Sequence, residues 1–87
     1  MIELKLFGRA QAGEPYETLL QRTQRVAARF PRQVIVREYE LNSDEARQLG
    51  IARAPALAIG GTLRYVGTIP TAGQISALLR VTVRQAQ

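Results

Sequence analysis

The fold of this chain is decided by residues 51–60, which read IARAPALAIG. Pro55 precedes a short apolar run over residues 56–59, and a second apolar run covers residues 63–66. Gly60 and Gly61 separate the two runs, and because both glycines can adopt positive φ angles they suit a two-residue hairpin turn. A proline directly before a hairpin indicates a defined turn, so this stretch predicts a turn followed by two antiparallel strands.

The first half of the chain predicts a strand, a helix and a second strand. Residues 2–6 alternate apolar and polar side chains, which is typical of a strand, and a loop is expected from Gly8 to Gly13. Pro15 suits the first turn of a helix, and Pro31 ends that helix. The β-branched run over residues 34–39 predicts the second strand. One face of the helix carries side chains at the spacing of a buried stripe: Tyr16, Leu19, Leu20, Thr23, Val26, Ala27 and Phe30.

The second half predicts two more helices around the hairpin. Ser43 is a good N-cap for a short helix that Gly50 ends. Thr71 and Gln74 have the spacing of a capping box at the start of the last helix, and residues 83–87 are expected to fray. The order is therefore βαβαββα in one α/β domain over residues 1–87. A right-handed crossover makes the first two strands parallel, within a four-stranded mixed sheet flanked by three helices. The buried stripe of the last helix is expected to be Ile75, Leu78, Leu79 and Thr82.

This order resembles the minimal thioredoxin or glutaredoxin fold over nearly the whole chain. Within that group the chain is most similar to the small thioredoxin-like proteins typical of prokaryotes. Their G-C-P-x-C-x-x-L motif corresponds to residues 13–20, GEPYETLL, in which Pro15 keeps the motif's proline. Residues 54–57, APAL, match the family's cis-proline segment, and Gly67 and Thr68 match the loop that walls its substrate groove. The resemblance implies that the Ala54–Pro55 bond is cis, which the sequence alone does not show.

The chain departs from this family in having no cysteine, and Glu14 and Glu17 stand where the two cysteines would be. Thiol–disulfide exchange needs a thiolate that attacks and a second sulfur that resolves the mixed disulfide, and carboxylates can do neither. We therefore expect no thiol–disulfide oxidoreductase activity. Acids in a first helical turn complement the helix dipole, and with no histidine and no third acid nearby they do not predict a metal or paired-carboxylate catalytic site.

The resemblance also implies where a ligand would bind. In the family, backbone groups next to the cis-proline pair with an extended peptide or with glutathione, a form of strand addition. Arg9 and Arg53 flank the same expected groove, where they could hold a carboxylate or phosphate, although two loop arginines are more often plain surface. Tyr16 could contribute a hydroxyl, but its spacing with the apolar stripe favours the core. The expected groove residues are Arg9, Glu14, Pro15, Tyr16, Glu17, Arg53, Ala54, Pro55, Gly67 and Thr68.

Composition limits the other classes of function. The net charge is +5, and no acid follows Glu45, so the second half is basic without a dense cluster. Few aromatic side chains are available for base stacking, which argues against nucleic-acid binding. The apolar runs are too short to span a bilayer, and the first residues lack the pattern of a signal peptide, so a cytoplasmic location is expected. A further helix face, with Arg22, Arg25 and Arg29, is expected to be solvated.

These observations favour a redox-inactive binding or regulatory protein, with no cofactor, over an enzyme. Its cis-proline groove or a sheet edge would bind a protein or peptide partner, and a homodimer is one possibility. The alternative is a protein that binds glutathione or a small anion, or a residual transferase using Tyr16 or Arg9, although the helical domain of such transferases is missing. A third reading is nucleic-acid binding through the basic half. A fourth is a regulator resembling the circadian clock protein KaiB, but residues 54–61, APALAIGG, are closer to the redox family.

Overall fold

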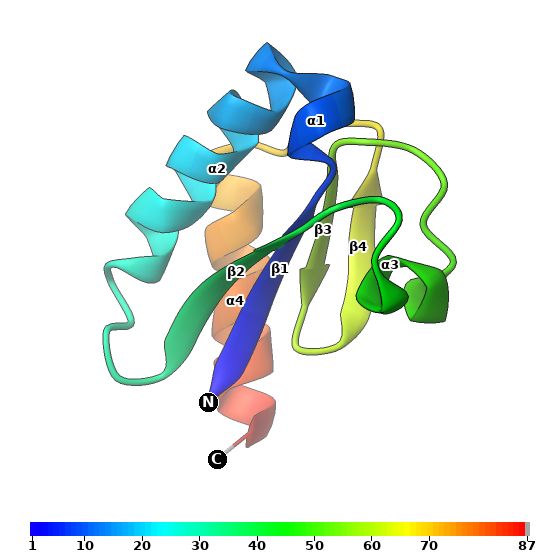
Figure 1. Ribbon diagram of the computed structural model, residues 1–87. Coiled ribbons are helices and arrows are strands. Elements are labelled where there is room, and N and C mark those ends of the chain that lie inside the picture. Colours follow the sequence, from blue (N-terminus) through cyan, green and yellow to red (C-terminus); the bar gives the residue numbers. More distant parts are fainter. Residues whose placement is uncertain (87) are drawn as a thin grey trace.

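The computed structural model describes residues 1–86, with side chains through residue 85, and Figure 1 shows its arrangement. The helices and strands follow one another as β1 (Ile2–Phe7), α1 (Arg9–Ala12), α2 (Glu14–Ala27), β2 (Val34–Tyr39), α3 (Asp44–Leu49), β3 (Ala56–Ile59), β4 (Thr62–Val66) and α4 (Ala72–Ala86). The structure is thus an α/β fold, as the sequence predicts, and it is compatible with a thioredoxin-like fold.

The four strands form one mixed sheet in the order β2-β1-β3-β4. β1 and β2 are parallel, with Leu4 opposite Val36 in register, so the predicted parallel pair is confirmed. β3 lies antiparallel to β1 and to β4, with Leu6 opposite Leu57. The β3–β4 hairpin turns at Gly60 and Gly61, whose φ angles of 58° and 84° are the positive values that a two-residue turn of this kind requires.

Each face of the sheet has its own apolar cluster because successive strand residues point to opposite sides. The larger cluster takes Leu4 and Leu6 from β1, together with residues of α2 and α4. The smaller one takes Phe7 from β1 and small alanines from β3, and Ala46 of α3 packs there. Figure 1 shows the same division, with α2 and α4 on one side of the sheet and the short α3 on the other.

Two expectations from the sequence are wrong. The predicted loop from Gly8 to Gly13 contains the four-residue helix α1, which raises the number of helices from three to four in the described residues. Gly8 and Gly13 have φ angles of 93° and 59°, and these positive values let the chain turn sharply into and out of so short a helix.

The C-terminal tail is the second correction. Helix α4 continues through Ala86 instead of fraying from residue 83. The reason is that Val83 packs into the larger core cluster, one helical turn after Leu79 and two after Ile75. Gln87, the last residue of the predicted tail, lies outside the described residues.

The predicted ends of α3 and the predicted start of α4 are confirmed, whereas α2 ends at Ala27, four residues before Pro31. The hydroxyl of Ser43 accepts a hydrogen bond from the amide of Ala46 at 3.1 Å, and Gly50 ends α3 in the left-handed conformation. At the start of α4, the Thr71 amide donates to Gln74 Oε1 at 2.8 Å and the Gln74 amide donates to Thr71 Oγ1 at 3.1 Å. This reciprocal pair is the predicted capping box.

Candidate functional site

The first turn of α2 lies at the end of the sheet where β1 finishes, next to α1 (Figure 1). Gly13 precedes it and Pro15 occupies its first turn, where the missing amide hydrogen removes no intrahelical bond. Glu14 and Glu17 are exposed acids in that turn, and their negative charge complements the positive end of the helix dipole.

Tyr16 is buried in the core, in agreement with its spacing along α2. Its hydroxyl donates a hydrogen bond to Glu38 Oε1 at 2.7 Å. Burial, and then this hydrogen bond to a carboxylate, raise the pKa of Tyr16 far above its usual value of 10.0. The phenol is therefore neutral at physiological pH and already has an acceptor, so it is not available to activate a thiol.

Arg9 joins α1 to both neighbouring elements. Its Nη2 lies 2.8 Å from Glu38 Oε1, and its Nε lies 3.2 Å from Glu17 Oε1. Its guanidinium carbon also lies 5.4 Å from the centroid of the Tyr16 ring, within range of a cation–π contact. Because two carboxylates already balance its charge, Arg9 is a poor anchor for an anionic ligand.

Glu38 is the residue of this cluster that the sequence analysis missed. It lies on edge strand β2, and its side chain, 40% exposed, receives both the Tyr16 hydroxyl and the Arg9 guanidinium. Twenty-two residues separate it from Tyr16. Only the parallel pairing, which places Glu38 opposite Leu6 near the end of β1, brings it next to α1 and α2.

The Ala54–Pro55 segment lies at the same end of the sheet, and its peptide bond is cis. Gly8 packs directly on it: a Cβ built on Gly8 would lie 2.3 Å from the Ala54 Cβ, closer than two carbon atoms can approach. The carbonyl of Pro55 accepts a hydrogen bond from the Gly67 amide at 2.8 Å. Within the described residues, neither the backbone amide nor the backbone carbonyl of Ala54 forms a hydrogen bond.

Arg53, Gly67 and Thr68 surround this segment and are exposed. The Arg53 guanidinium lies beside Gly67, within 3.7–3.9 Å of the position that a Cβ on that glycine would occupy. The ten residues expected to form a groove therefore fall into two groups. One group lies at the start of α2, where Arg9 contacts Tyr16 and Glu17 while Glu14 and Pro15 are exposed. The other is the segment of Arg53, Ala54, Pro55, Gly67 and Thr68, on which Gly8 packs.

In the described part of the chain, no three acidic, histidine or cysteine side chains come close enough together to hold a metal ion. No helix there combines the length and apolar character needed to cross a membrane.

The fold and this site define an α/β protein with a mixed four-stranded sheet and a cis-proline segment beside the start of a helix. Comparison of the sequence with protein-family models and with curated proteins finds no match.

Proposed function

We propose that this chain is a redox-inactive protein of the thioredoxin-like kind that binds an extended peptide segment of a partner protein. The peptide would pair with the backbone of Ala54, next to Pro55. The observation that carries the proposal is the pair of hydrogen-bonding groups that Ala54 leaves without partners at the end of the sheet. Backbone pairing of this kind gives affinity, and the side chains around it select the sequence that binds.

The chemistry of the neighbouring residues supports binding over catalysis. The chain has no cysteine, so thiol exchange has no nucleophile. The Tyr16 hydroxyl and the Arg9 guanidinium, which a residual transferase would need, are engaged with Glu38 and Glu17. What remains is the half-buried Ala54, whose backbone groups form no hydrogen bond within the described residues, and the exposed side chains of Arg53 and Thr68.

The proposal is tested with peptides selected from a random library displayed against the purified chain. A selected peptide is then titrated into 15N-labelled protein, and the backbone amide shifts are followed by NMR. We expect the largest shifts at Ala54, Gly67 and Thr68. Shifts confined to β2, the edge strand on the far side of β1, would refute peptide binding at Ala54 and would favour the sheet edge as the binding site.

A charge reversal provides the matched control. Arg53→Glu places the change beside Ala54, whereas Arg84→Glu makes the same change on an exposed residue in the last turn of α4. We expect Arg53→Glu to change peptide affinity at least about fivefold, which corresponds to roughly 1 kcal/mol, and Arg84→Glu to leave it unchanged. Equal effects of the two variants would mean that the peptide responds only to net charge.

A further inference from the structure

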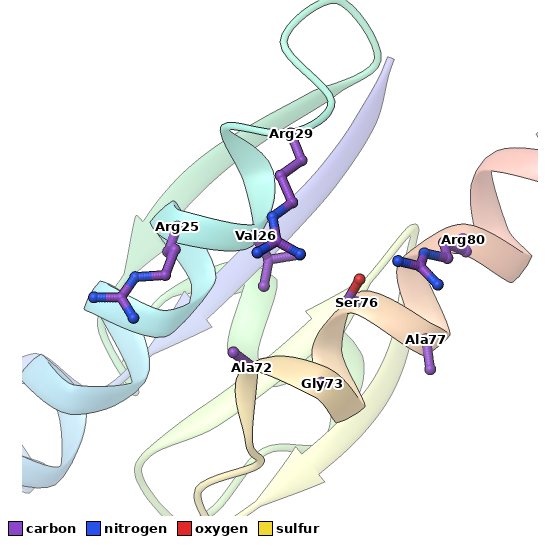
Figure 2. Close-up of a pocket in the computed structure, with 8 residues that line it drawn as sticks. All are labelled: Arg25, Val26, Arg29, Ala72, Gly73, Ser76, Ala77 and Arg80. Atoms are coloured by element: carbon purple, nitrogen blue, oxygen red, sulfur yellow. The ribbon is translucent and has the colours of Figure 1, made fainter.

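A second feature lies away from the cis-proline segment, between the last turns of α2 and the first half of α4. There the surface forms a hollow of about 270 Å³. Its walls include Arg25 and Arg29 from the α2 side, and Ala72, Gly73, Ser76 and Arg80 from α4. Figure 2 shows that Arg29 and Arg80 approach the space from opposite sides with Ser76 between them, while the guanidinium of Arg25 extends along α2 away from it.

The hollow carries positive charge without a protein counter-charge. Among the residues that the structure describes, three arginines line it and no acidic side chain does. In the described residues, the arginines that form ion pairs with carboxylates are Arg9, Arg37 and Arg47, and not those of the hollow. Like charges around one hollow repel one another, and a bound anion would relieve that repulsion.

Ser76 supplies an observation that is independent of the arginines. Ser76 is only 6% exposed, and its Oγ is buried without a hydrogen-bond partner in the described part of the chain. Buried hydroxyl groups in folded proteins nearly always have a partner, so an orphaned one indicates a missing acceptor or donor. Figure 2 shows this oxygen pointing from α4 into the gap between Arg29 and Arg80.

The start of α4 borders the hollow, since Ala72 and Gly73 form part of its wall. The capping box of Thr71 and Gln74 satisfies the amides at its two ends, but the amides of Ala72 and Gly73 between them have no intrahelical acceptor. The positive end of the dipole of this 15-residue helix therefore lies against the hollow. Arg22 on α2 donates a hydrogen bond to the carbonyl of Pro70, just before α4, at 2.9 Å.

We propose that this hollow binds the phosphate group of a small phosphorylated molecule. Two guanidinium groups can each donate two hydrogen bonds to phosphate oxygens, and the Ser76 hydroxyl can donate one more. A phosphate dianion balances two arginines, whereas a carboxylate balances one. The volume is close to the lower end of the range for small-molecule sites, so it accommodates a phosphate with a short organic group. This site uses none of the residues of the peptide-binding proposal.

The test is an NMR titration of the 15N-labelled chain with inorganic phosphate and with pyrophosphate, and sodium chloride controls for ionic strength. We expect saturable shifts at the amides of Ala72, Gly73 and Ser76 at millimolar or lower phosphate. Arg29→Gln and Arg80→Gln should each weaken pyrophosphate binding at least about tenfold, while Arg84→Gln, which removes the same charge elsewhere, should change it less than about twofold.

Ser76→Ala separates binding from folding. It removes the orphaned hydroxyl, so the melting temperature should stay unchanged or rise while phosphate affinity falls. Three results would overturn the proposal: no saturation at millimolar phosphate, an equal loss of affinity in Arg84→Gln, or full affinity in Ser76→Ala. Tighter binding of a single-stranded oligonucleotide than of pyrophosphate, with shifts extending to Arg64 and Arg84, would also refute it and assign the basic surface to nucleic acid.

Discussion

The close approach of Gly8 to Ala54 predicts a large and specific effect of one added methyl group. Gly8→Ala places a Cβ 2.3 Å from the Ala54 Cβ, at a residue whose φ is 93°. The left-handed conformation costs an L-residue roughly 1–2 kcal/mol, and forcing extra volume into a packed site costs roughly 1–3 kcal/mol more. We therefore expect the free energy of unfolding to fall by about 2–5 kcal/mol. Gly50→Ala is the control, because Gly50 has a φ of 70° but nothing within 4 Å of a new Cβ, and only the conformational part should remain.

A double-mutant cycle isolates the contact itself. Ala54→Gly removes the Cβ that the new methyl group meets, so Gly8→Ala should be about twofold less destabilising in an Ala54→Gly background than in the natural chain, because the cost of the positive φ remains. Urea unfolding followed by circular dichroism measures all four free energies of the cycle. An interaction energy near zero would refute the inference that the β1–α1 turn packs directly on the cis-proline segment. A cost for Gly8→Ala no larger than that for Gly50→Ala would refute it equally.

Three smaller predictions concern single hydroxyl groups. In the described residues Thr23 Oγ1 is buried without a hydrogen-bond partner, so Thr23→Val should stabilise the fold by about 1–2 kcal/mol. Thr82→Val should not stabilise it, because the Thr82 hydroxyl donates a hydrogen bond to the Leu78 carbonyl. Melting temperatures that rise equally in the two variants would contradict this prediction. The raised pKa of Tyr16 means that the contribution of this residue to stability is constant well below pH 10 and falls above it, where the unfolded chain loses a proton that the folded chain keeps. Tyr16→Phe should flatten this fall in unfolding free energy between pH 10 and 11. Ser43→Ala removes the N-cap of α3 and should cost about 1 kcal/mol, measured by urea unfolding, and no change would mean that the cap contributes nothing.

Local signals in the sequence explain most of the fold. The β-branched run of β2, the capping residues of α3 and α4 and the glycine pair of the hairpin each act over a few residues, so they can be read without knowing the rest of the chain. Helix α1 could not be predicted in the same way, because residues 9–12 are too few to show a helical period. The end of α4 did carry a signal, since Ile75, Leu79 and Val83 follow one another at intervals of four residues.

The candidate site was predictable only in part, for the same reason. The position of Tyr16 in the core follows from its helical spacing, and the resemblance supplied the Pro55 segment. Glu38 was not predictable, because it reaches the site through strand pairing across 22 residues. The hollow was missed because Arg25 and Arg29 share a helix face that the sequence marks as solvated, and only the packing of α4 against α2 brings Arg80 and Ser76 next to them.

Two parts of the chain touch both proposed sites. Helix α2 has its first turn next to the peptide-binding segment and its last turn at the hollow, and the segment after β4 leads from Gly67 and Thr68 to Ala72 in the wall of the hollow. The acids of α2, Glu14 and Glu17, lie in its first turn, next to the peptide-binding segment, while Arg25 and then Arg29 follow at its other end. The rise of an α-helix separates Glu14 from Arg25 by about 16 Å, twice the Debye length of about 8 Å at physiological salt. Charge bound beside Arg25 is therefore largely screened from the first turn of α2, but Ala72 on the other wall of the hollow follows Thr68 by only four residues. We therefore expect any coupling between phosphate and peptide binding to pass through the segment from Thr68 to Ala72, and not through α2, whose first turn is joined to α1 and β2 by the ion pairs of Arg9 with Glu17 and Glu38.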